Sequence, residues 1–200
     1  MKLLKAEIAI IMAVIIAFIF SVTTFAETCT GIRESVLRLH VIANSDSEED
    51  QALKLKVRDA VLEAGNEIFD GSVTRDEAKA KIEPNIDKLE EAAKKVITEN
   101  GYDYPVEITV SEEYFSTRTY EGFTLPAGQY MAVRVVIGTG EGHNWWCIMF
   151  PPLCLPAASE DTSIDCVLTE KEVKLVEKSP EYEPRFKIIE IYEKIMSKLK

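Results

Sequence analysis

Residues 129–137 read QYMAVRVVI, a run of apolar and β-branched side chains that predicts a β-strand. Upstream, VEITV at 106–110 alternates apolar with polar side chains, which is typical of a strand with one buried face. We expect that strand to continue through YFSTRTY at 114–120 into a turn. Downstream, GTGEG at 138–142 connects to a third strand, NWWCIMF at 144–150. These runs predict an antiparallel sheet of about three to five strands.

Upstream of these strands lies a β-like run at 36–43, and a polar turn, Asn44-Ser45-Asp46-Ser47, follows it. Acidic residues then begin a helix expected over 48–64, where the helix dipole favours negative charge. Its apolar residues recur at helical spacing and form one stripe along the helix. Gly65 is the expected end of this helix.

The next segment contains a capping box, with Thr74 as N-cap and Glu77 three residues later. Pro84 interrupts the helical pattern that follows, because a proline removes a hydrogen bond from a helix interior. We therefore expect one helix near 75–82 and a longer one near 84–99.

The C-terminal part shows a loop pattern over 155–170 and a short element of undecided type at 173–176. A closing amphipathic helix is expected over 186–199. The predicted class is α+β, with one domain over residues 27–200 whose sheet is packed by helices.

The N-terminal segment has the layout of a membrane-targeting sequence. Lys2 and Lys5 precede an unbroken apolar run, IAIIMAVIIAFIF at 8–20, and Ala26 ends the segment. The segment is either a signal peptide cleaved before Glu27 or an uncleaved anchor of nearly spanning length. In both cases the body lies outside the cytoplasm, secreted or membrane-anchored, and membrane contact is expected if the segment is retained.

The formal net charge of −11 makes a nucleic-acid partner improbable, because phosphate backbones require basic surfaces. The four cysteines are Cys29, Cys147, Cys154 and Cys166, and export permits disulfides among them. Four cysteines allow three complete pairings. Cys147 and Cys154 flank a proline turn and are the first choice, while the alternative is that some or all are free and buried.

No catalytic constellation stands out from the sequence. The two histidines, His40 and His143, lack a local nucleophile motif; His40 fits a polar strand face and His143 a turn before a strand. The acidic residues at 46–50 lack the glycine and final glutamate of a calcium loop. The glycines at 138–142 lack a lysine and a following helix. We therefore expect no catalytic residue, no metal site and no cofactor.

The pair Trp145-Trp146 is more informative. Adjacent strand residues point to opposite faces, so one tryptophan is expected in the core and the other facing away from it. An outward tryptophan beside a proline turn is either an interface anchor or is covered by another element of the same chain.

Two stretches together carry a resemblance to a known family: LHVIANSDSEEDQ at 39–51 followed by KLKVRD at 54–59, and GHNWWCIMFPPLC at 142–154. The chain resembles the stage II sporulation protein R family of endospore-forming bacteria, over most of 33–155. The resemblance implies a signalling protein, made in the forespore and exported between the two septal membranes. It implies as partner a membrane-embedded aspartic protease of the mother cell that processes pro-sigma-E.

The family supplies no residue-level activation mechanism. From polarity and exposed aromatic rings we expect the partner to contact the turn at 44–50 and the segment at 143–154. The expected contact residues are Asn44, Ser45, Asp46, His143, Asn144, Trp145 and Trp146. The alternative functions are an exported hydrolase acting on the cell wall and a passive structural protein of the envelope.

Overall fold

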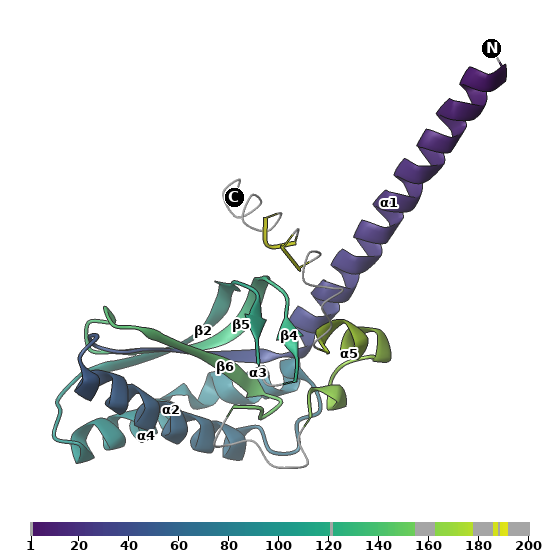
Figure 1. Ribbon diagram of the computed structural model, residues 1–200. Coiled ribbons are helices and arrows are strands. Elements are labelled where there is room, and N and C mark those ends of the chain that lie inside the picture. The colour runs from purple at the N-terminus through teal and green to yellow at the C-terminus, as the bar shows by residue number, and fades with distance from the viewer. Residues whose placement is uncertain (1, 121, 155–162, 178–185, 188, 192–200) are drawn as a thin grey trace.

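The protein has the expected α+β architecture: a four-stranded sheet packed by helices, and an N-terminal helix that projects from the body (Figure 1). The computed structural model describes residues 2–120, 122–154, 163–177, 186, 187 and 189–191.

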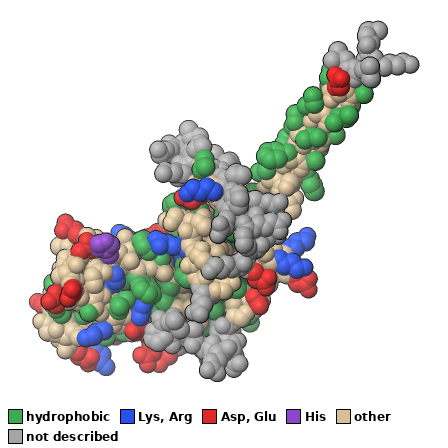
Figure 2. Space-filling model, viewed as in Figure 1, with side chains coloured by type: hydrophobic (Ala, Val, Ile, Leu, Met, Phe, Trp, Pro, Cys, Tyr) green, Lys and Arg blue, Asp and Glu red, His purple; other side chains and the backbone are tan. Residues whose placement is uncertain are grey.

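The first helix, α1, runs without a break over Lys2–Ser35. Its apolar part is exposed, and green side chains line the projecting helix in Figure 2. Within it, Ala6–Ser35 is long and apolar enough to cross a membrane, a property that signal sequences share. By contrast, Cys29 and Ile32 near its end are fully buried in the body. The helix therefore continues through residue 26, and the boundary expected there stays a prediction.

The sheet has the strand order β2-β5-β1-β6. The strands are β1 (Leu37–Ile42), β2 (Val106–Phe115), β5 (Gly128–Ile137) and β6 (Asn144–Phe150). β2 with β5 and β1 with β6 are antiparallel, but β1 and β5 are parallel. The sheet is therefore mixed, which corrects the expectation at one pair. Helices and three strands, β2, β3 and β4, separate β1 from β5 along the chain, and a connection of that length allows parallel pairing.

A small hairpin follows β2. β2 ends at Phe115 and does not reach residue 120, because β3 (Arg118–Thr119) pairs separately with β4 (Thr124–Leu125). An isolated bridge between Phe123 and Glu177 ties this hairpin to the end of α5.

One face of the sheet, the inner face, packs against helices, with α2 and α4 beneath it in Figure 1. These helices are α2 (Glu48–Ile68), α3 (Arg75–Ile82), the 3-10 turn η1 (Glu83–Asn85) and α4 (Ile86–Glu99). α2 continues past Gly65, which was expected to end it. A side chain at Gly65 would collide with Met149 of β6, so this glycine allows close packing of helix on sheet.

The opposite face, the outer face, is covered at one end by a second apolar cluster. The cluster joins the last turns of α1 to η2 (Ile164–Cys166) and α5 (Glu170–Val176). Phe186 and Ile189 are buried in it, whereas most of the expected loop over 155–170 and closing helix over 186–199 lies outside the described residues. At the other end, strands and loops alone form this face within the described part of the chain (Figure 1).

Candidate partner-binding surface

Two loops meet where β1 ends and β6 begins, and we call them the tip: residues 43–47, after β1, and residues 138–143, before β6. The pairing of Ile42 with Asn144 places them side by side. Asp46 and His143 are 97 positions apart in the sequence but in contact at the tip. The structure thus joins the two segments that the sequence predicts as contact surfaces.

Asn44 holds the two loops of the tip together. Its side-chain Oδ1 accepts a hydrogen bond from the Thr139 N–H at 3.0 Å, and its main-chain oxygen accepts one from the Thr139 hydroxyl at 2.9 Å. Gly138 has a φ of 60°, and a Cβ there would collide with the Asn44 side chain. Glycine is therefore favoured at this position for two reasons: the backbone has a positive φ, and there is no room for a Cβ beside Asn44.

Asp50, at the start of α2, fixes the first loop of the tip and is only 5% exposed. Its Oδ2 accepts hydrogen bonds from the Ser45 hydroxyl at 2.6 Å and from the Asn44 amide at 2.9 Å. Burial acts to raise the pKa of Asp50, but hydrogen bonds from Ser45, Asn44 and Tyr104 outweigh it and the pKa is lowered. Asn44 and Ser45 therefore use their side chains to shape the tip.

Asp46 and His143 form the exposed part of the tip. The His143 N–H donates to Asp46 Oδ1 at 2.6 Å, and the ring Nδ1 contacts the same oxygen. Lys54 of α2 donates to the His143 carbonyl at 3.0 Å. The His143 side chain is 76% exposed and the Asp46 side chain 55%, so both are accessible from solvent. Figure 2 shows a histidine among acidic side chains at this end of the molecule.

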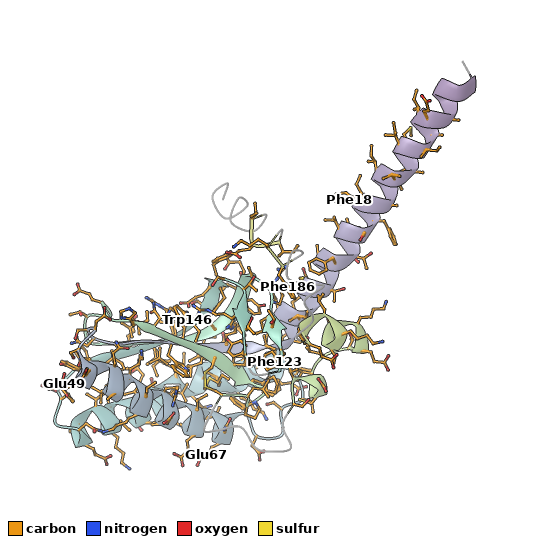
Figure 3. The ribbon with its side chains drawn as sticks, viewed as in Figure 1. Phe18, Glu49, Glu67, Phe123, Trp146 and Phe186 are labelled. Carbon is orange, nitrogen blue, oxygen red and sulfur yellow. A yellow bond between two sulfur atoms is a disulfide. The ribbon has the colours of Figure 1, made fainter. Side chains whose placement is uncertain are left out.

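Trp145 and Trp146 point to opposite faces, as strand alternation predicts. Trp145 packs against the inner core and under Arg58, whose guanidinium carbon lies 4.4 Å from its ring centroid. Trp146 lies on the outer face, opposite Glu49 and Glu67 of α2 in Figure 3. Of the two, Trp146 is therefore the tryptophan that lies on the face away from the helix-packed core.

His40 lies beside Trp146 on the outer face. Its Nδ1 donates to Glu113 Oε2 at 2.7 Å, and its Nε2 lies 3.0 Å from the Asn144 side-chain oxygen. A charged ring donating to the amide oxygen, or a neutral ring accepting from a flipped amide nitrogen, fits this geometry. The imidazole also stacks on the Trp146 indole, with ring centroids 5.5 Å apart.

Arginines complete this arrangement. The Arg118 guanidinium carbon lies 4.0 Å from the Trp146 ring centroid, so the indole contacts both Arg118 and His40. Arg134 Nε lies 3.2 Å from the second oxygen of Glu113, and its side chain is 42% exposed. We call this group the outer-face cluster; its members are His40, Glu113, Arg118, Arg134, Asn144 and Trp146.

Arg38 lies behind the outer-face cluster and is fully buried among aromatic rings. Its guanidinium carbon is 4.0 Å from the Phe115 centroid and 5.0 Å from that of Tyr130, and Nη2 donates to the Tyr120 hydroxyl. Nε and Nη1 have no hydrogen-bond partner among the described residues. Burial lowers the pKa of Arg38, and the nearby positive charge of Arg118 acts in the same direction.

Cys147 and Cys154 form the disulfide that was the first choice from the sequence. It closes the loop after β6, and the peptide bond between Phe150 and Pro151 within that loop is cis. Cys166 is exposed and free, and Cys29 is buried in the second cluster.

The sequence predicts Asn144 and Trp146 as contact residues, and no sequence signal pointed to the arginines and Glu113 that lie beside them. His40 was expected on a polar strand face. Period-two alternation does put Arg38, His40 and Arg134 on faces of their own strands, but only the pairing of β1 with β5 shows that they share one face. Within the described residues, no group of three or more histidine, cysteine or acidic side chains could hold a metal ion.

Comparison with known proteins gives a consistent assignment. A family model described as stage II sporulation protein R matches residues 33–160, which include all four strands of the sheet and the tip. The chain is 34% identical over 123 residues to stage II sporulation protein R of Bacillus subtilis (strain 168). That alignment covers 62% of this chain and 55% of the relative, so the chain matches about half the length of that protein. No solved structure matches the chain.

Proposed function

The chain belongs to the stage II sporulation protein R family, and on that premise we propose that it is an exported signal that activates a membrane-embedded aspartic protease, which then processes pro-sigma-E. Family membership supports the role in sporulation and favours a signalling protein over an enzyme. That the partner is this protease is the more specific part of the proposal. The observation that supports the proposal is the family match across the whole sheet and the tip.

The N-terminal helix supports export as part of this function. Lys2 and Lys5 precede the apolar stretch, so the positive-inside rule keeps them in the cytoplasm and directs the body across the membrane. The body then reaches the space between forespore and mother cell, facing the second membrane. Cleavage after Ala26 would release the signal, and an intact α1 would tether it.

The environment of His40 supports a signal over a hydrolase. The ring contacts a carboxylate, an amide and aromatic side chains, and no serine or cysteine side chain of the described residues is hydrogen-bonded to it. A histidine held in this way shapes a surface but lacks the nucleophile that acyl transfer requires.

Within this function, the contact surface runs from Asp46 and His143 at the tip to Trp146 on the outer face. Asn144 links the two parts, because it begins β6 and contacts His40. The surface combines an aromatic anchor with arginine, a composition enriched at interface hot spots.

Reconstitution tests the proposal. The protease would be placed in the vesicle membrane, and its substrate, pro-sigma-E, would be enclosed inside the vesicle. The purified body, residues 27–200, would be added outside. We expect cleavage to appear only when the protein is present and only from the face opposite the substrate. Cleavage that is equal without it, or that requires it on the substrate side, would refute the proposal. The Leu39→Asp variant is the negative control. It places a charge in the core and should not fold, so it should not cause cleavage.

A further inference from the structure

The outer face has a charge that contrasts with the rest of the chain. Two carboxylates of β2, Glu113 and the exposed Glu107, lie on this face. The formal net charge of the protein is −11, yet Arg118 and Arg134 lie here together, with the fully buried Arg38 behind them. Among the described residues, Glu113 provides the only carboxylate within 4.0 Å of any of them. A pair of accessible arginines on an acidic protein is a place where a carboxylate of a partner can bind, while the remaining surface repels negative charge.

Arg118 retains hydrogen-bonding capacity. Its guanidinium carbon lies 4.0 Å from the Trp146 ring centroid, and a guanidinium carries five N–H donors. Within the described part of the chain, its side chain donates to no acceptor and pairs with no carboxylate. An arginine stacked in this way is pre-organised, because the ring restricts the side chain before any ligand arrives.

Arg134 and Arg38 differ from Arg118 in their exposure and in their hydrogen-bond partners. Arg134 meets Glu113 through Nε, and its side chain is 42% exposed at the surface. Arg38 is fully buried, and its Nε and Nη1 lack partners within the described residues. A buried guanidinium with unsatisfied donors is costly, and a nearby negative charge lowers that cost.

We infer that the outer-face cluster docks an acidic, extended segment of a partner protein, with carboxylates placed on Arg118 and Arg134 and an apolar side chain against Trp146. This inference rests on the proposed function, in which the partner is the protease, and adds the chemistry of the segment that it presents. The two accessible arginines, Arg118 and Arg134, suit two carboxylates, and the buried Arg38 adds positive charge behind them. A nucleic acid would need a longer basic surface than this chain offers.

The first test uses peptides and does not depend on the protease. A twelve-residue peptide rich in glutamate with one central leucine is titrated into the isotope-labelled body and followed by NMR. We expect the Trp146 indole N–H and the Arg118 and Arg134 Nε–H resonances to shift, and a lysine-rich peptide of the same length to leave them unchanged. Shifts confined to lysines of α4, or equal with both peptides, would overturn the inference.

The second test measures binding to the protease in vesicles. Arg118→Glu/Arg134→Glu is compared with Lys88→Glu/Lys95→Glu, which makes the same charge change on exposed positions of α4. We expect the arginine variant to bind at least about tenfold more weakly and the lysine variant to stay within about twofold of the parent. Binding of the arginine variant at parental strength, or equal loss in both variants, would contradict the inference.

Two controls separate the possible failures. Thermal unfolding identifies a variant that does not fold, and Arg118→Gln/Arg134→Gln then replaces the charge reversal. A parent protein that binds the acidic peptide but not the protease would refute the proposed function and leave the acidic docking site intact. Dimerisation of the parent that the arginine variant abolishes would show a second copy as the occupant and overturn the inference.

Discussion

The two faces of the sheet are made by the same strands but have opposite characters. On the inner face, Leu39 and Val41 of β1 are fully buried against helices. On the outer face, Arg38 and His40 of the same strand meet charged and aromatic side chains. Period-two alternation therefore directs one set of side chains to the helix-packed core, and the end of the outer face that the second cluster leaves uncovered is the surface that we propose for recognition. Substitutions on the inner face or beneath the second cluster should lower stability, and substitutions at the uncovered end of the outer face should affect binding.

The largest expected effect comes from breaking the inner face. Leu39→Ala should lower the free energy of unfolding by about 2–5 kcal/mol, because it leaves a cavity in a fully buried site. Thr109→Ala, on the outer face of β2, should change it by less than about 0.5 kcal/mol. Urea unfolding measures both values, and equal losses would contradict the division of roles between the faces.

The disulfide between Cys147 and Cys154 is expected to stabilise the loop that follows β6. Replacing both Cys147 and Cys154 by serine removes a cross-link with a sequence separation of 7. The chain-entropy relation for so short a loop predicts a loss of about 2–3 kcal/mol of unfolding free energy. The parent under reducing conditions is the matched comparison. Unchanged stability in both would show that the loop is held without the cross-link.

The tip should respond to acid through Asp50. Because the folded state lowers its pKa, Asp50 stabilises the fold above the unfolded pKa of about 4 and loses that contribution as pH falls through the folded value. Asp50→Asn should therefore be less stable than the parent at pH 7, by about 1–2 kcal/mol for its hydrogen bonds. The difference should shrink below about pH 4. A difference that stays constant with pH would contradict the role assigned to the carboxylate.

The smallest expected change in stability is on the outer face itself. Arg118→Ala should cost no more than about 1 kcal/mol, since it removes one partly exposed cation–π contact with Trp146. Tryptophan fluorescence should still change, because the indole loses its cover, and Arg118→Lys should restore part of the change. A loss as large as that of Leu39→Ala would mean that this face also holds the fold together.

Local patterns predicted most of the fold. Alternation located β5 and β6 within one residue, and Pro84 correctly divided α3 from α4. The parallel pairing of β1 with β5 was not predictable, because periodicity along one strand says nothing about the direction of its neighbour. Gly65 was taken for a helix end because its contact with Met149 is made across the fold.

The candidate surface was only partly predictable for the same reason. The sequence identified Asn144 and Trp146, whose residue types stand out in a strand. Arg118, Arg134 and Glu113 are ordinary residues in their own segments, and only the pairing of distant strands brings them to Trp146. Asn44 and Ser45 were expected at the contact surface, and the structure shows their side chains engaged within the tip.

The most direct test of the central claim measures protease activation and unfolding free energy for one variant, Asn144→Ala/Trp146→Ala. If the uncovered end of the outer face recognises the partner while the inner face holds the fold, this protein should remain folded, with a loss of no more than about 3 kcal/mol because Trp146 is only partly buried. It should also fail to trigger processing of pro-sigma-E. A folded variant that activates as well as the parent would contradict the account.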